Sequence, residues 1–182
     1  MMGIASMEPI ATVLIIVLVI AVIWDLRSSR IPNWLTFPAM SIALAGHAWL
    51  DGMDGVLFSM AGLGTGLGLF ILVYLVGGMG AGDVKLLAGV GAWIGMGDTL
   101  YAFCVSAVVG GVIALLMVAY RRAWTKHYFQ FLTIWYDMMT IRDPEQLSTI
   151  AAERKSTMLL LPYGIPIAIG TIAYFAFKGM LI

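Results

Sequence analysis

The sequence predicts an all-α polytopic membrane protein with six transmembrane helices, and with the N-terminus and the C-terminus both outside. Three observations support this class. Apolar residues make up 62% of the 182 residues, and only 11% are charged. The mean hydropathy is +0.98, and the apolar residues gather into long runs. Soluble domains are closer to about 45–50% apolar and about 25% charged, and a small domain cannot bury so much apolar surface in water.

The apolar runs are compared with the roughly 20 residues, range about 17–25, that a helix needs to cross a bilayer. The expected spans are approximately 9–24, 34–50, 55–76, 84–96, 99–120 and 158–177. The fourth run has only about 13 residues and would extend about 20 Å as a helix. We therefore expect a short fourth span with a glycine-rich entry. Either this span begins below the membrane surface or the bilayer is thinned there.

The distribution of basic residues predicts that the N-terminus lies outside. The first run has no basic segment before it, which argues against a signal peptide. With six spans and an outer N-terminus, Lys178 is the one basic residue placed outside. This asymmetry follows the positive-inside rule. The basic residues placed on the cytoplasmic side are Arg27, Arg30, Lys85, Arg121, Arg122, Lys126, Arg142, Arg154 and Lys155.

The chain is expected to form a single membrane-embedded domain over residues 1–182, with one sizeable cytoplasmic loop at about 121–157. Within this loop, apolar side chains recur at helical spacing over 128–139. This pattern indicates either a helix packed on the bundle or an amphipathic helix lying in the membrane interface. The interfacial helix is the favoured interpretation.

Composition excludes several classes of site. A net charge of zero provides no basic stripe for phosphates, so no nucleic-acid partner is expected. The single cysteine, Cys104, excludes a disulfide scaffold and a tetrathiolate zinc site. The sequence implies neither a metal ion nor an organic cofactor.

Two acidic residues carry the functional interpretation. Asp25 ends the first expected span and Asp83 begins the fourth, so topology places both at the cytoplasmic face. Ionisable groups beside spans usually have a task, and two carboxylates that share a proton can divide the acid and base roles of an aspartic protease. The alternatives are a charge pair between Asp25 and Arg27 and a helix N-cap at Asp83.

Glycine residues crowd the segment before Asp83, at positions 77, 78, 80 and 82. Glycine lets backbones approach closely, and irregular backbone at membrane depth is tolerated only where it lines protein or a watered cavity. The segment therefore indicates room for an extended substrate beside Asp83, and the alternative is a plain tight turn. If the first interpretation holds, alanine at Gly80 or Gly82 should reduce cleavage at normal expression.

Two further patterns concern packing. In the third expected span, Gly62 and Gly66, and likewise Gly64 and Gly68, have the four-residue spacing typical of close helix contacts. In the last expected span, Pro162 and Pro166 are expected to kink the helix.

Three separated blocks of sequence resemble the prepilin leader peptidases, a family of Gly-x-Gly-Asp membrane aspartic proteases that also includes the archaeal preflagellin peptidases. The blocks occur in the family's order and extend from the first expected span to the last. They are Asp25-Leu26-Arg27 continuing to Arg30-Ile31-Pro32-Asn33, then Gly80-Ala81-Gly82-Asp83-Val84-Lys85, and finally Leu161-Pro162-Tyr163-Gly164-Ile165-Pro166-Ile167-Ala168.

The resemblance implies an aspartic endopeptidase with Asp25 and Asp83 as its catalytic pair. The implied substrate is the basic leader of a type IV prepilin or pseudopilin, cut at the cytoplasmic face of the inner membrane. Membrane lipid and other pilus-assembly proteins are the further implied partners. The residues expected to bind substrate or support the site are Gly80, Gly82, Lys85, Pro162 and Gly164.

Larger members of that family carry a cytoplasmic insertion with paired cysteines, which is associated with N-methylation of the product. This chain has one cysteine, so it resembles the short CpaA/TadV-like form that serves Flp/Tad-type pili. The resemblance therefore implies cleavage and does not extend to methylation. Two alternatives stay open: a small transporter or channel subunit that moves protons or cations through the same two Asp residues, and a non-catalytic assembly factor.

Overall fold

The structure is a computed structural model that describes residues 4–28, 31–75, 79–120, 132, 133, 136, 140 and 163–179. Over the described residues the long elements are all helices, which confirms the predicted fold class. They are α1 (Ile4–Ser28), α2 (Asn33–Leu75), α3 (Ala81–Tyr120) and α6 (Gly164–Phe177). The expected interfacial helix over 128–139 and Pro162 lie outside the described residues, except for isolated positions in the former.

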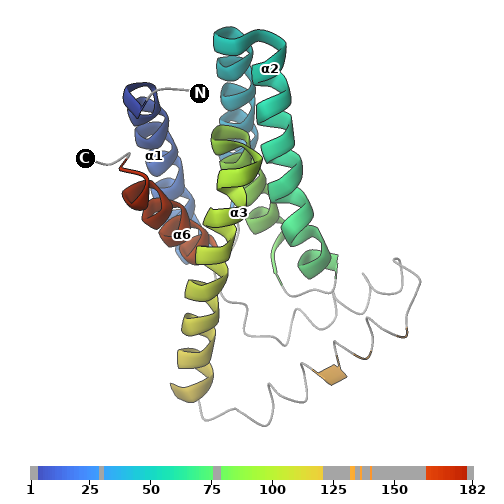
Figure 1. The fold of residues 1–182 in the computed structure, drawn as a ribbon. Coiled ribbons are helices and arrows are strands. Elements are labelled where there is room, and N and C mark those ends of the chain that lie inside the picture. The colour runs from blue at the N-terminus through green and yellow to red at the C-terminus, as the bar shows by residue number, and fades with distance from the viewer. Residues whose placement is uncertain are drawn as a thin grey trace.

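Each of the two longest helices is bent back on itself at one glycine. Gly52 interrupts α2 with φ 59° and ψ −131°, and Gly95 interrupts α3 with φ 79° and ψ 174°. Glycine adopts positive φ without the steric cost that a side chain would impose. Figure 1 shows that the chain reverses direction within α2 and again within α3.

The bends fall close to the boundaries expected between spans. Gly52 separates the second expected span from the third, and Gly95 lies near the end of the short fourth one. By length and apolar composition, α1, α2 and α3 can each cross a membrane, and α6 is a shorter apolar helix. Six crossings, and the side on which each terminus lies, remain predictions.

The two bent helices, α2 and α3, pack against each other through glycine residues. A Cβ at Gly62 would collide with the carbonyl group of Gly91, and one at Gly66 would collide with that of Leu87. This confirms close packing for Gly62 and Gly66. The same expectation is wrong for Gly64 and Gly68, which have no atom within 4 Å of the added carbon. A shift of two residues turns a helix by about 200°, so these two glycines lie on the opposite face.

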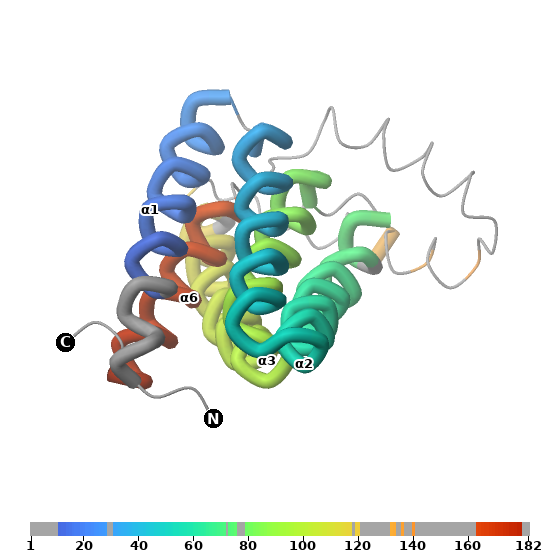
Figure 2. The backbone as a smooth tube through the Cα atoms, turned by 90° about the horizontal axis from the view of Figure 1, so that it is seen from above, coloured from blue at the N-terminus to red at the C-terminus, as the bar shows by residue number. Residues whose placement is uncertain are grey.

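Helix α6 packs between α1 and the second half of α3 (Figure 2). Gly170 lies against Ser106, and Pro166 lies 3.5 Å from the Cβ position of Gly110. Pro166 belongs to the first turn of α6, because this helix begins at Gly164. Proline is tolerated in a first turn, so the expected kink at Pro166 within the helix is wrong.

Candidate active site

Four segments meet at the end of the bundle where α1 finishes and where α2, α3 and α6 begin. The backbone N–H of Gly164, at the start of α6, reaches the last turn of α1. The start of α3 contacts Ile31, just before α2, through Gly82. Figure 2 shows the end of α1 beside the beginnings of α2 and α3. All three sequence blocks therefore contribute described residues to one end of the molecule.

Asp25 lies in the last turn of α1 and is only 4% exposed. Its Oδ2 atom accepts a hydrogen bond of 3.1 Å from the backbone N–H of Gly164, a residue 139 positions away in the chain. The first N–H groups of a helix have no partner within the helix and favour a nearby negative charge. The start of α6 therefore compensates part of the cost of burying this carboxylate.

The position of Gly164 requires glycine because the backbone passes very close to the carboxylate. A Cβ at this residue would lie 2.8 Å from Oδ2 of Asp25 and 3.4 Å from its Cβ atom. A methyl group in that place would displace the Asp25 carboxylate or the start of α6. Gly164 was predicted as a supporting residue, and the structure brings it into direct contact with Asp25.

Asp83 lies in the first turn of α3 and is 7% exposed. Its Oδ2 atom accepts a hydrogen bond of 3.1 Å from the backbone N–H of Gly80, and its own N–H donates to the Gly80 carbonyl at 3.2 Å. A side chain in the first turn that reaches back in this way is half of a capping box. Asp83 is the third residue of α3, which begins at Ala81, so the alternative that Asp83 is the N-cap is wrong. Its buried carboxylate nevertheless supports the start of the helix through Gly80.

The third block also brings Tyr163 to the site, directly before Gly164. Its ring meets that of Phe70, from α2, edge to face with centroids 5.9 Å apart. Tyr163 was not among the predicted site residues. The available signal was its place beside Gly164 within the third block.

Lys85 connects the beginnings of α2 and α3. Its Nζ atom donates a hydrogen bond of 2.9 Å to Oδ1 of Asn33 and lies 5.2 Å from the ring centroid of Phe37. A lysine above an aromatic ring gains a cation–π attraction. These contacts give Lys85 a structural role, and its expected part in binding substrate or supporting the site remains a prediction.

Gly80 and Gly82 contact protein atoms within the site. A Cβ at Gly82 would lie 3.0 Å from the backbone nitrogen and the Cβ atom of Ile31, and one at Gly80 would lie 3.1 Å from Oδ2 of Asp83. Neither residue is among the described glycines with positive φ. Packing against Ile31 thus explains glycine at position 82 without a substrate, and a substrate role for either residue remains a prediction.

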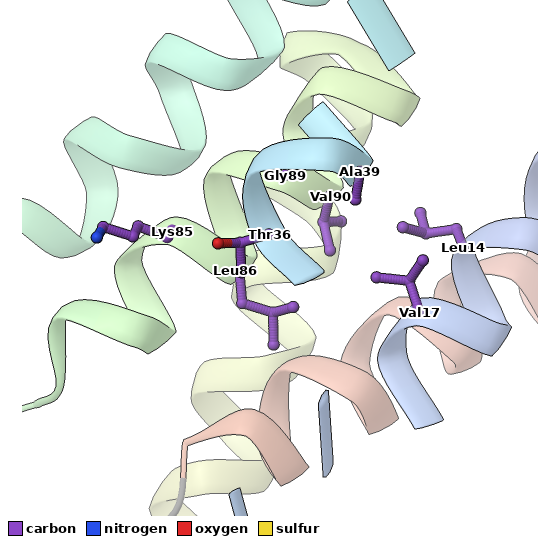
Figure 3. A pocket seen from close by; sticks show the side chains of 8 residues that line it. All are labelled: Leu14, Val17, Thr36, Ala39, Lys85, Leu86, Gly89 and Val90. Atoms are coloured by element: carbon purple, nitrogen blue, oxygen red, sulfur yellow. The ribbon is translucent and has the colours of Figure 1, made fainter. Parts of the chain in front are cut away.

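A small apolar pocket lies between α1, α2 and α3 near the site (Figure 3). Thr36 and Lys85 are the polar residues in its otherwise apolar lining. The hydroxyl of Thr36 is buried and has no hydrogen-bond partner among the described residues. Lys85, which lines the pocket, follows Asp83 by two residues in the sequence. The lining residues are Leu14, Val17, Thr36, Ala39, Lys85, Leu86, Gly89 and Val90.

Comparison with known protein families shows to which family the chain belongs. The type IV leader peptidase family matches residues 12–115, more than half of the chain and a range that contains both Asp25 and Asp83. The chain belongs to the type IV leader peptidase family. Together with the apolar helices, this membership indicates a multi-pass membrane protein of the inner membrane. Residues 163–179, which complete the site around Asp25, lie beyond the matched range.

Several curated relatives of this chain bear the name prepilin leader peptidase/N-methyltransferase. The one from Xanthomonas campestris pv. campestris is 36% identical over 95 residues, which are 49% of this chain and 33% of the relative. The one from Pseudomonas aeruginosa is 34% identical over 105 residues, 54% and 36% of the two chains. The one from Escherichia coli K12 is 37% identical over 102 residues, 53% and 44%. The matches thus span under half of each relative. No solved structure matches the chain.

Proposed function

We propose that this protein is an aspartic endopeptidase that removes the basic leader from type IV prepilins or pseudopilins. One observation carries the proposal: Asp25 and Asp83, from two separate family blocks, are both buried at the same end of the bundle and each accept a backbone hydrogen bond. Family membership and the names of the relatives support the same reaction.

The chemistry follows from what two carboxyl groups can do together. One ionised carboxylate takes a proton from a water molecule, whose oxygen then attacks the carbonyl carbon of the scissile peptide. The other carboxyl group, still protonated, gives its proton to the carbonyl oxygen. When the tetrahedral intermediate collapses, the C–N bond breaks and the leaving nitrogen receives the proton that the first carboxylate took from water. The second carboxylate takes a proton back from a hydroxyl group of the intermediate, which restores the pair. The backbone N–H groups of Gly80 and Gly164 donate to one oxygen of Asp83 and of Asp25, respectively, which helps to orient the two carboxyl groups.

The more specific substrate is a Flp/Tad-type prepilin. This part of the proposal rests on the resemblance to the short form of the family and on the single cysteine in the chain. Membrane lipid and other pilus-assembly proteins are the remaining proposed partners.

We place the site at the cytoplasmic face of the inner membrane, with six crossings and the N-terminus outside. Support comes from the nine basic residues that fall on one side in this arrangement, against Lys178 on the other. Single cysteines at residues 52 and 148, introduced after replacement of Cys104, test the placement. A membrane-impermeant reagent should label residue 52 in intact cells, and labelling of residue 148 would refute it.

A cleavage assay tests the activity. Purified protein in detergent should shorten a Flp/Tad-type prepilin by the length of its leader, and a prepilin whose leader has lost its basic residues should be cut more slowly. A variant carrying both Asp25→Asn and Asp83→Asn serves as the inactive control. Failure to cut any prepilin under conditions in which a relative does so would refute the proposal.

A further inference from the structure

Helix α6 and the second half of α3 pack side by side and run in opposite directions. Pro166 of α6 lies 3.5 Å from the Cβ position of Gly110. One turn further along α6, Gly170 lies against Ser106, which is one turn back along α3. Each contact is therefore one helical turn from the next on both helices, which is the pattern of two helices packed in a single register.

The same register extends to the far end of the bundle. Lys178, directly after α6, lies two turns beyond Gly170, and Asp98 lies two turns before Ser106. The Nζ atom of Lys178 and the Oδ1 atom of Asp98 are 3.8 Å apart. These contacts, all in step, define the height of α6 along α3.

Gly170 allows a very close approach of the two helix backbones. A Cβ at this position would collide with Oγ of Ser106, and it would lie 2.6 Å from the Ser106 backbone nitrogen and 2.8 Å from the Ala102 carbonyl oxygen. The Ser106 hydroxyl is itself held in place, because it donates a hydrogen bond of 2.6 Å to the same carbonyl. Backbone atoms cannot rotate away as the end of a side chain can, so only glycine fits at position 170 at this height of α6.

The other end of α6 lies at the candidate active site. Gly164 begins the helix, and its N–H donates the hydrogen bond of 3.1 Å to Oδ2 of Asp25. The first turn is closed by a bond of 3.1 Å from the Ile167 N–H to the Tyr163 carbonyl, so α6 moves as one unit. Gly164 precedes Gly170 by a rise of about 9 Å. A slide of α6 by about 1 Å would therefore stretch the bond to Asp25 beyond the usual range of about 2.7–3.2 Å.

We propose that Gly170 is a positioning residue for Asp25: its contact with Ser106 sets the height of α6 along α3 and thereby holds the Gly164 N–H at hydrogen-bonding distance from the carboxylate. Gly170 is buried within the bundle, so its influence on the reaction passes through α6. This inference rests on the proposed endopeptidase function. Catalytic groups must be held within about 0.5 Å of the productive geometry, and a close backbone contact on the same helix provides such a hold.

The substitution Gly170→Ala tests the proposal because the added methyl group must displace α6 from α3. We expect kcat for prepilin cleavage to fall about 10- to 100-fold with KM within about twofold, since misplacement of a catalytic group is felt in the transition state. The matched control is Gly111→Ala on α3, which faces open space and should leave both constants unchanged. A kcat for Gly170→Ala within threefold of wild type would overturn the proposal.

A cycle with Gly164→Ala separates positioning from a general loss of stability. If Gly170 acts through the bond between Gly164 and Asp25, the double variant should be at most about threefold slower than the slower single variant, because both changes break the same contact. Effects on kcat that multiply would show independent actions and would overturn the proposal.

A further measurement does not depend on cleavage. Hydrogen exchange of the Gly164 amide, followed by NMR on protein labelled with 15N-glycine in detergent micelles, reports whether its hydrogen bond is intact. The resonance is identified by its absence from Gly164→Ala. We expect exchange to be about tenfold faster in Gly170→Ala and unchanged in Gly111→Ala. Exchange at the wild-type rate in Gly170→Ala would overturn the proposal.

If Gly170→Ala does not accumulate in the membrane, Ser106→Cys applies a milder form of the same pressure from α3, because sulfur is larger than oxygen. In that variant we expect kcat to fall about 3- to 10-fold with faster exchange at Gly164, and wild-type values for both would overturn the proposal. If exchange at Gly164 responds while wild type cuts no prepilin, the role of Gly170 in the register stands and the endopeptidase function fails. If wild type cuts prepilin and neither exchange nor kcat responds, only the role of Gly170 fails.

Discussion

The acidic residues at the two ends of the helix bundle differ in burial and in hydrogen bonding. At the site end, Asp25 and Asp83 are buried and accept hydrogen bonds from backbone N–H groups. At the opposite end, Asp51 and Asp54 are exposed, and Asp98 is partly exposed with Lys178 at 3.8 Å. Burying a carboxylate is costly even when it is hydrogen-bonded. Among the acidic residues whose burial the structure describes, those at one end alone carry that cost, a pattern typical of a site kept for its chemistry rather than for stability.

Glycine also serves different purposes at the two ends. At the far end, Gly52 and Gly95 adopt positive φ and reverse the chain. At the site end, Gly82 and Gly164 are sites of close approach, where an added Cβ would meet Ile31 or Asp25. The first use concerns the dihedral angles of the glycine itself, whereas the second concerns the space that a distant segment occupies. The following experiments test this contrast between the ends.

The largest effect is expected from the buried acids. Asp25→Asn and Asp83→Asn should each lower kcat for prepilin cleavage by at least about 1,000-fold, and the double variant should be scarcely worse because the two residues act as a unit. Asp98→Asn, at the far end, should retain activity within twofold. Protein level in the membrane checks folding for all four variants. Activity within tenfold of wild type in either single variant would remove that residue from the catalytic pair.

The next effect concerns close approach at Gly164. A methyl group there would lie 2.8 Å from Oδ2 of Asp25, so Gly164→Ala must displace the carboxylate or the start of α6. Misplacement by about 1 Å costs about 100-fold in rate, and we expect kcat to fall by 10- to 100-fold at normal expression. The matched control is Gly64→Ala, which faces open space. Equal activity of the two variants would contradict the role assigned to Gly164.

A smaller effect, on stability alone, is expected from substitutions at the contact between α2 and α3. Gly62→Ala pushes a methyl group against the Gly91 carbonyl and should lower the free energy of unfolding by about 1–3 kcal/mol, the usual cost of overpacking. Gly68→Ala has no neighbour to displace and should be neutral, or stabilising by about 0.5–1 kcal/mol. Unfolding in mixed detergent micelles measures both. Loss of stability in Gly68→Ala equal to that in Gly62→Ala would refute the assignment of the two faces.

The smallest effect is expected from the link between Lys85 and Asn33. Asn33→Ala removes an acceptor that is partly open to solvent, so the free energy of unfolding should fall by only about 0.5–1.5 kcal/mol. Cleavage by the folded enzyme should stay within about threefold of wild type. A loss of activity above tenfold at unchanged stability would show that the lysine acts on the reaction itself.

Local features of the chain could be predicted from the sequence. The positions of the helices follow from the lengths of the apolar runs, and the breaks near Gly52 and Gly95 follow from where those runs end. Asp25 and Asp83 emerged as candidates because acids beside long apolar runs are rare and their topology places them on one face. These inferences need only composition and order along the chain.

The contacts that build the site were decided by the tertiary structure. Nothing local distinguishes Gly62 from Gly64, yet one touches the Gly91 carbonyl and the other faces open space. The hydrogen-bond partner of Asp25 lies 139 residues away. The contacts of Tyr163 with Phe70 of α2 and with the Gly110 position of α3 arise from the packing of these helices. Such contacts depend on how far each helix is rotated about its axis and on its height relative to its neighbours. Both quantities are set by the packing of the whole bundle, because side chains on one helix fix the face that the next helix can present.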